Sequence, residues 1–128
     1  MKLLLDTHTA LWLLNEHEKL SSKVKKLLLN DANTLYFSIA SAWEIAIKVR
    51  LGKLPELDGG VSILLAKIGD MPIELLPITL RHVEAVETLP LIHRDPFDRL
   101  LVAVAKVSGM TILTADENIH KYDVASIW

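Results

Sequence analysis

The sequence contains no cysteine, and neither sign of charge is in large excess. Without cysteine the chain has no disulfide, no thiolate metal site and no cysteine nucleophile, which suits a reducing cytosol. Its 14 Lys and Arg residues and 16 Asp and Glu residues give a formal net charge of −2 at pH 7. A protein with this balance has no global basic field that holds nucleic acid by releasing counterions. Any contact with nucleic acid must therefore be local.

The sequence also has no apolar run long enough to cross a membrane. Its longest stretch without Asp, Glu, Lys or Arg covers only residues 32–43, which is too short to span a bilayer. The opening segment MKLLLDTHTALWLL resembles a signal peptide only as far as Asp6, and no small-residue cleavage pattern follows. With 128 residues and 51% hydrophobic content, the sequence predicts a soluble cytoplasmic protein with one domain, residues 1–128, and a packed core.

Short apolar segments alternate with helical patterns along the chain. The sequence predicts strands over residues 2–5, 34–38, 73–78, 111–116 and 123–128. It predicts helices over residues 9–20, 23–31, 39–52, 58–69, 80–89 and 95–109. We expect the third helix to be mostly buried, and Pro77 indicates a sheet edge or a strand end. Strands that alternate with helices predict an α/β domain with a mainly parallel central sheet.

Four acidic residues fall where a parallel sheet forms its sites. Asp6 and Asp116 end two predicted strands, and Asp98 opens the helix before the fourth strand. Glu44 lies in an apolar segment with no Lys or Arg within three residues on either side. Sites in open parallel sheets form beyond the carboxyl ends of the strands, and carboxylates that meet there repel one another unless a cation neutralises them. An oxygen-rich cluster without cysteine predicts Mg²⁺ or Mn²⁺.

The segment HRDPFDRLLVAVA, residues 93–105, places two aspartates at one helix start. Asp95 fits the N-cap, and Pro96 fits the first helical position. Asp98 follows in the first turn, where a negative charge meets the positive end of the helix dipole. However, Asp98 also shares the i, i+3, i+4, i+7 spacing of the apolar stripe, which a simple helix-start charge does not require.

The other three carboxylates also have structural alternatives. Asp6 fits a turn after a strand, and Glu44 fits a capping box with Ser41 in the segment SAWE. Asp116 fits the cap of a short helix over residues 117–122. The joint placement of the acids at one predicted sheet edge favours a shared site over these separate roles.

The remaining polar and aromatic residues give weaker signals. The five histidines show no zinc-binding spacing, and we expect most of them at the surface or at helix ends. Trp12 and Trp43 fit core or groove-wall positions, and an interface role requires that they are exposed. Five cations are well placed to contact phosphates: Lys48, Arg50, Lys53, Arg94 and Arg99.

Four segments in this order, LLLDTHTALWLL, SIASAWEIAIKVRLGKL, HRDPFDRLLVAVA and ILTADENIHKY, resemble the PIN-domain VapC-type toxins of bacterial toxin–antitoxin pairs. The resemblance implies a three-layer α/β/α sandwich with a five-stranded, mainly parallel sheet. It also implies a Mg²⁺-dependent endoribonuclease, a hydrolase that cleaves RNA phosphodiester bonds, with a cognate antitoxin and a second copy of the chain as protein partners. The acidic quartet of the family, which binds metal and performs catalysis, matches Asp6, Glu44, Asp98 and Asp116. The hydroxyl residues beside it match Thr7 and Thr114.

Three other functions stay open on the sequence. A haloacid-dehalogenase-like phosphatase also places an Asp after its first strand, but it expects a second acid where His8 stands. A nuclease that acts on DNA shares the same site chemistry, because no feature of the sequence recognises the 2′-hydroxyl of RNA. A non-catalytic PIN-like protein-binding module would use the acids as helix caps, and it would bind no Mn²⁺ through them.

Overall fold

The computed structural model describes all residues from 1 to 128. Five strands form its sheet: β1 (Lys2–Leu5), β2 (Thr34–Ser38), β3 (Ile73–Leu76), β4 (Thr111–Leu113) and β5 (Ser126–Ile127). Seven α-helices surround the sheet: α1 (Thr7–Asn15), α2 (Ser22–Leu29), α3 (Ile39–Arg50), α4 (Gly60–Gly69), α5 (Leu80–Glu87), α6 (Pro96–Ser108) and α7 (Glu117–His120). One short 3₁₀-helix, η1 (His17–Lys19), follows α1. None of the helices combines the length and the apolar character that a membrane span requires.

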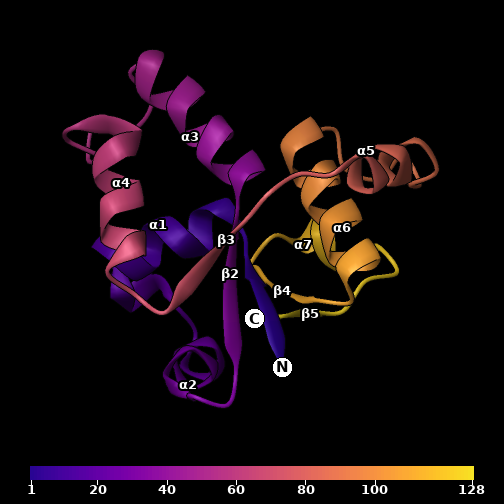
Figure 1. Cartoon of the computed structure of the whole chain (residues 1–128), viewed down its shortest axis with the longest axis horizontal. Helices are drawn as coiled ribbons and strands as arrows, with labels where there is room; N and C mark the ends of the chain where they lie inside the picture. Colours follow the sequence, from indigo (N-terminus) through magenta and orange to yellow (C-terminus); the bar gives the residue numbers. More distant parts are fainter.

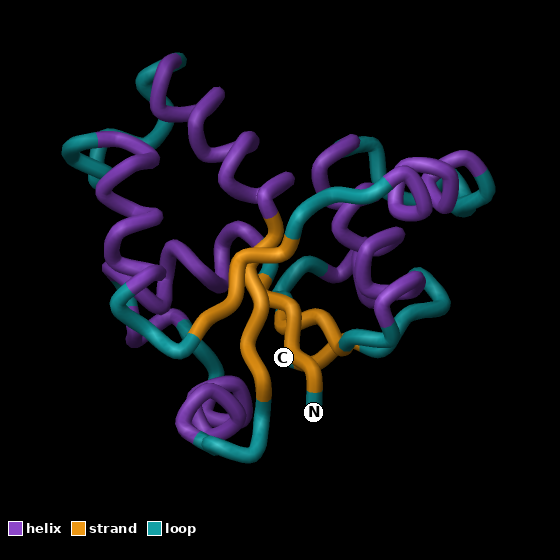
Figure 2. The backbone as a smooth tube through the Cα atoms, viewed as in Figure 1, coloured by secondary structure: helices purple, strands orange, loops and turns teal.

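The five strands run parallel in the order β3-β2-β1-β4-β5, so β1 lies at the centre of the sheet (Figure 1). Leu4 of β1 pairs with Tyr36 of β2 on one side and with Ile112 of β4 on the other. Helices α1, α3 and α4 lie on one side of the sheet, and α5, α6 and α7 lie on the other (Figure 2). The predicted α/β/α architecture with a five-stranded parallel sheet is therefore confirmed.

The alternating side chains of β1 divide the apolar residues between two cores. Leu3 and Leu5 belong to a cluster of 15 buried residues, together with Phe37 of β2 and Leu64 of α4. Leu4 belongs to a second cluster of 11 buried residues, which includes five consecutive residues of α6. A parallel strand that is covered on both faces needs apolar residues at every position. Both helical layers therefore pack on this one central strand.

The predicted ends of α6 are confirmed. The Asp95 side chain accepts a hydrogen bond from the backbone N–H of Phe97, and Pro96 occupies the first turn. Gly109 follows the last residue with a φ of 65°, a left-handed conformation that suits a residue without a Cβ. Asp98 therefore lies in the first turn of a helix whose two ends are both fixed.

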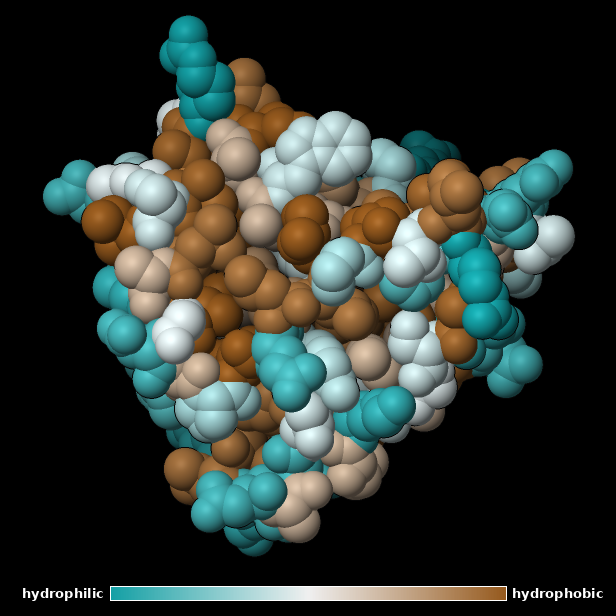
Figure 3. Space-filling model, in the orientation of Figure 1, coloured by the Kyte–Doolittle hydropathy of each residue, from teal (hydrophilic) through white to brown (hydrophobic).

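The prediction that α3 is mostly buried is wrong. Only four of its 12 residues are buried. Three apolar residues of α3 and the leucine at its C-cap instead form an exposed stripe at four-residue spacing, the α3 stripe: Ile39, Trp43, Ile47 and Leu51. Trp43 is 60% exposed, although the ring of Phe97 packs edge-on against it at a centroid distance of 5.0 Å. Figure 3 shows apolar surface, in brown, across this face of the molecule. Helical spacing of apolar residues does not distinguish a core from an interface.

Several element ends differ from the prediction. Helix α1 begins at Thr7, two residues earlier, because the Asp6 side chain caps it. Strand β3 is an edge strand that ends directly before Pro77, as the proline indicates. Strands β4 and β5 are shorter than predicted, so that Asp116 lies in the turn after β4 and not within the strand.

Candidate active site

The four predicted acidic residues come from elements that meet at the carboxyl edge of the sheet. Asp6 follows β1 and caps α1, and Asp116 follows β4 and caps α7. Asp98 lies in the first turn of α6, and Glu44 lies on α3, which begins directly after β2. Because the strands are parallel, the segments that follow them lie at the same edge.

His93, Asp98 and Asp116 form a tight group at this edge. The Nε2 atom of His93 lies 3.1 Å from Asp98 Oδ2 and 2.9 Å from Asp116 Oδ2. The ligand atoms of the three residues all lie within 4.8 Å of one another. The Nδ1 atom of His93 accepts a hydrogen bond from the backbone N–H of Asp95 at 3.1 Å. Because Nδ1 is an acceptor here, Nε2 carries the ring proton and directs it at the two carboxylates.

Thr114 connects Asp6 to Asp116. The Thr114 hydroxyl donates a hydrogen bond to Asp6 Oδ2 and accepts one from the backbone N–H of Asp116 at 3.0 Å. The other oxygen of Asp6 accepts a hydrogen bond from the backbone N–H of Thr9 at 2.7 Å. Asp6 and Asp116 both line a cavity of about 260 Å³, together with His8. Asp6 is thus fixed through both of its oxygens beside the group that contains Asp116.

Glu44 is buried on α3, where both of its oxygens have partners. The hydroxyl of Thr7 donates to Glu44 Oε1 at 2.8 Å, and Lys48 Nζ lies 2.6 Å from Glu44 Oε2. The capping-box alternative is wrong, because Ser38 caps α3 and the Ser41 hydroxyl lies 3.0 Å from the hydroxyl of Thr7. The cation that pairs with Glu44 stands four residues along the helix, where side chains i and i+4 are neighbours.

Burial raises the pKa of Asp98 to about 7. The negative charges of Asp95, Glu44 and Asp116 contribute to this increase, whereas the contact with His93 opposes it. A carboxyl group with a pKa near 7 indicates that the nearby positive charge does not offset the cost of burying its ionised form.

The two neighbouring aspartates respond differently to the same surroundings. Burial raises the pKa of Asp6, although the hydrogen bonds from Thr114 and Thr9 oppose the increase. Burial also acts to raise the pKa of Asp116, but the hydrogen bonds from His93 and from the backbone N–H groups of α7 outweigh it, so that this pKa is lowered. Asp116 therefore keeps its negative charge more readily than Asp98 and Asp6 do.

The sequence did not single out His93. Its nearest acidic partners are Asp98, five positions away, and Asp116, 23 positions away, and neither spacing matches a metal-binding motif. The one local feature that fixes its position is the N-cap residue of α6, because His93 accepts a hydrogen bond from the backbone N–H of Asp95. His82 is buried, but it lies at a helix end as expected for most histidines, because it completes a capping box with Thr79 in the first turn of α5.

The donor set of this edge suits a divalent cation. Carboxylate oxygens, in the absence of thiolates, are the ligands that Mg²⁺ and Mn²⁺ prefer. Among the lysines and arginines, only Lys48 pairs with any of the four carboxylates, and its partner is Glu44. The other three, Asp6, Asp98 and Asp116, have no lysine or arginine to neutralise them. Burial is the main cause of the raised pKa of Asp98, and a bound divalent cation would remove the repulsion from the other acids that adds to it.

Comparison with known proteins points to one domain family and one fold. The family model described as the PIN domain matches residues 3–125. VapBC2 from Rickettsia felis, bound to a DNA fragment from its promoter, gives a TM-score of 0.73 at 17% identity, with 99% of this chain and 98% of that chain covered. DNA-bound VapBC from Salmonella typhimurium gives a TM-score of 0.68 at 16% identity and coverages of 100% and 97%. VapBC-1 from nontypeable Haemophilus influenzae gives 0.65 at 15% identity and coverages of 99% and 97%. No curated protein sequence matches the chain.

Proposed function

Because the chain belongs to the PIN-domain family of nucleases, we propose that it is a metal-dependent endoribonuclease that cleaves RNA phosphodiester bonds. The observation that carries the proposal is the group of His93, Asp98 and Asp116, whose ligand atoms lie within 4.8 Å of one another. Asp6 and Glu44 approach the same group, because Thr114 connects Asp6 to Asp116 and Glu44 contributes to the raised pKa of Asp98.

In this proposal Asp6, Asp98 and Asp116 hold Mg²⁺ or Mn²⁺, and Glu44 completes the acidic quartet. A divalent ion held there would polarise the scissile phosphate and favour deprotonation of the attacking water. Asp98 must give up its proton to become a ligand, so a lower pKa of Asp98 is a consequence of ion binding. Thr114 and Thr9 hold the two oxygens of Asp6 and thereby orient this ligand.

Glu44 has a different proposed role. Its oxygens are occupied by the hydroxyl of Thr7 and the ammonium group of Lys48, so it is fixed at the border of the site. From this position we propose that Glu44 orients the attacking water and accepts its proton. The water oxygen then bonds to phosphorus while the bond from phosphorus to the leaving ribose oxygen breaks.

We further propose that the chain is the toxin of a toxin–antitoxin pair in the cytoplasm. The support is the resemblance of its four motifs to VapC-type toxins and its structural likeness to VapBC assemblies. In this proposal a cognate antitoxin covers the acidic edge and blocks cleavage. The exposed first half of the α3 stripe, Ile39 and Trp43, supports a second protein contact, and we propose that a second copy of the chain packs against these two residues.

Cleavage of an RNA pool by the purified chain, freed of any bound partner, tests the nuclease proposal. We expect cleavage with Mg²⁺ or Mn²⁺ and none with chelator. Asp98→Asn should reduce the rate by about 100-fold or more, because a ligand and a negative charge are both lost from the site. Asp31→Asn, which changes an exposed aspartate at the opposite edge of the sheet, is the matched control and should cleave at the unchanged rate.

Three outcomes would contradict parts of the proposal. Full cleavage by Asp98→Asn would remove the assignment of the site. Cleavage of single-stranded DNA of the same sequence in preference to RNA would replace the endoribonuclease with a nuclease that acts on DNA. A folded chain that binds no Mn²⁺ and cleaves neither substrate would be a non-catalytic binding module.

A further inference from the structure

Next to the acidic edge, the structure contains a cavity with a different chemistry. It has a volume of about 390 Å³ and lies between the end of α3 and the start of α6. We call it the basic cleft, because three cations line it: Lys48, Lys53 and Arg94. Glu44 lines it as well, so the basic cleft adjoins the acidic quartet directly.

The charges in the basic cleft leave two cations without a partner. Lys48 pairs with Glu44, and the other acid in the lining, Asp95, accepts the backbone N–H of Phe97 as the cap of α6. Lys53 and Arg94 make no side-chain hydrogen bond and no ion pair, and both side chains are exposed. Both are therefore available to a ligand that approaches from solvent.

The structure separates these two cations from the other three candidates of the sequence. Arg99 donates hydrogen bonds to the carbonyl groups of Pro90 and Val86 and to the hydroxyl of Tyr122, so it fixes the loop before α6. Arg50 does not line the basic cleft, and Lys48 is held by Glu44. Arginine and lysine side chains without a protein partner are the groups that contact nucleic-acid phosphates.

The walls of the basic cleft also suit a nucleotide. Ile47, Leu51 and Phe97 provide apolar surface beside the cations, and aromatic and apolar side chains accept the faces of unpaired bases. The combination of two free cations with an apolar wall matches a phosphate joined to a ribose and a base. A simple inorganic anion would use only the cations.

We propose that the basic cleft is a substrate subsite that binds one nucleotide of single-stranded RNA beside the scissile bond, with Lys53 and Arg94 contacting its backbone phosphate. This subsite rests on the proposed endoribonuclease function, since it extends the same site along the substrate. The positive charge of the subsite comes from two neighbouring residues, which agrees with the expectation that a chain without net positive charge contacts nucleic acid only locally. Lys48 keeps Glu44 paired, so the incoming phosphate meets a neutralised carboxylate at the border.

The test measures binding of a fluorescein-labelled single-stranded RNA to the full chain in chelator, by anisotropy over a series of KCl concentrations. Lys53→Gln with Arg94→Gln should weaken binding at low salt about tenfold or more. The slope of log K against log[salt] should become shallower by about 0.7, since the two cations contact one phosphate and each neutralised phosphate on a single strand contributes about 0.7. Arg81→Gln with Lys67→Gln removes the same charge from exposed positions outside the cleft and should keep the slope of the unchanged chain.

Equal slopes for the two double variants would overturn the subsite, and so would a chain that binds no RNA. If the true ligand of the basic cleft is an acidic segment of a protein partner, Lys53→Gln with Arg94→Gln should bind RNA as tightly as the unchanged chain does. This result would also overturn the subsite. Cleavage by the unchanged chain separates the two proposals. If the chain cleaves RNA but the two double variants have equal slopes, only the subsite is contradicted. If the two double variants differ in slope but the unchanged chain does not cleave RNA, the subsite is supported and the nuclease proposal is contradicted.

Discussion

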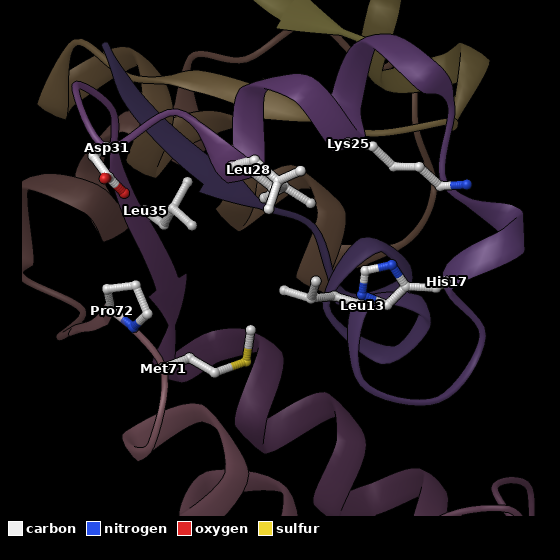
Figure 4. Close-up of a pocket in the computed structure, with 9 residues that line it drawn as sticks. Leu13, His17, Lys25, Leu28, Asp31, Leu35, Met71 and Pro72 are labelled. Carbon is white, nitrogen blue, oxygen red and sulfur yellow. The ribbon is translucent and has the colours of Figure 1, made fainter.

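The two edges of the sheet have opposite chemistry. The carboxyl edge gathers four carboxylates, three of which have no lysine or arginine partner. The amino edge has a cavity of about 370 Å³ that α1, α2 and the start of β2 line. Figure 4 shows Leu13, Leu35 and Met71 around this cavity, where most of the lining side chains are apolar.

The difference shows that cavity size does not identify the site of this protein. The amino-edge cavity is larger than the cavity of about 260 Å³ that Asp6 and Asp116 line, and it is nearly as large as the basic cleft of about 390 Å³. However, the apolar cavity contains no convergent set of ligand atoms, whereas the acidic edge maintains a carboxyl group whose pKa is raised to about 7. A buried charge without a neutralising partner destabilises the fold, so its retention favours a functional role. The amino edge, in contrast, contributes packing.

Truncation at the amino edge should produce the largest change in stability. Leu35 is buried on β2 and lines the apolar cavity, so Leu35→Ala should lower the free energy of unfolding by about 2–4 kcal/mol. Leu29→Ala is the control, because Leu29 lines the same cavity but is 83% exposed. Its change should stay below about 0.5 kcal/mol. Urea unfolding measures both, and a large loss of Mn²⁺ affinity in folded Leu35→Ala would show that the two edges are coupled.

Ion binding at the carboxyl edge should produce a change of intermediate size. An ion that binds only the folded chain stabilises it by about 2.7 kcal/mol at a concentration 100 times its Kd. We expect Mn²⁺ to raise the free energy of unfolding by about this amount in the unchanged chain and in Leu35→Ala. Asp98→Asn should lose most of the increase. Denaturation with Mn²⁺ and with chelator gives both values, and an equal increase in Asp98→Asn would place the ion elsewhere.

The smallest effect concerns the pH dependence of stability in chelator. The pKa of Asp98 is raised from 3.8 to about 7, so between these values the folded chain holds a proton that the unfolded chain has released. The contribution of Asp98 to stability therefore falls as the pH rises from about 4 to about 7 and stays low above this range. Above pH 7, Asp98→Asn should be more stable than the unchanged chain by about 1–2 kcal/mol, because the loss of the His93 contact offsets part of the gain.

The control for this pH dependence is Asp31→Asn, which alters an exposed aspartate at the amino edge. Its unfolding curves should follow those of the unchanged chain at every pH. A flat pH profile for the difference between Asp98→Asn and the unchanged chain would mean that Asp98 is already neutralised by a neighbour. The contrast between the two edges would then disappear.

Most of the fold could be predicted from the sequence, because its signals are local. The short apolar run of β1, the cap at Asp95 and the glycine at position 109 each act within a few residues. The burial of α3 could not be predicted in the same way. Its apolar stripe has helical spacing, but whether the stripe faces the sheet or the solvent depends on how the helix is rotated. Trp43 is exposed for this reason.

Spacing and topology predicted only the acidic members of the candidate site, whereas Thr7 and Thr114 were indicated by the family resemblance alone. Asp6 and Asp116 follow strands, and parallel topology brings such residues together. The partners of these acids depend on tertiary contacts: His93 meets Asp116 across 23 positions, and Thr114 meets Asp6 across 108. Asp116 also shows that a structural and a functional interpretation need not exclude each other, since it caps α7 while it belongs to the acidic group.

The central position of β1 has a consequence for synthesis on the ribosome. The hydroxyl of Thr114, which binds Asp6, stands 108 positions after it along the chain, so that Thr114 and the partner strand β4 are translated later than β1. Contacts between such distant segments form late in folding. A nascent chain that has not yet released Thr114 and Asp116 from the exit tunnel has no complete acidic centre. If the chain is the proposed endoribonuclease, a nascent chain would therefore be unable to cleave RNA until these segments have emerged.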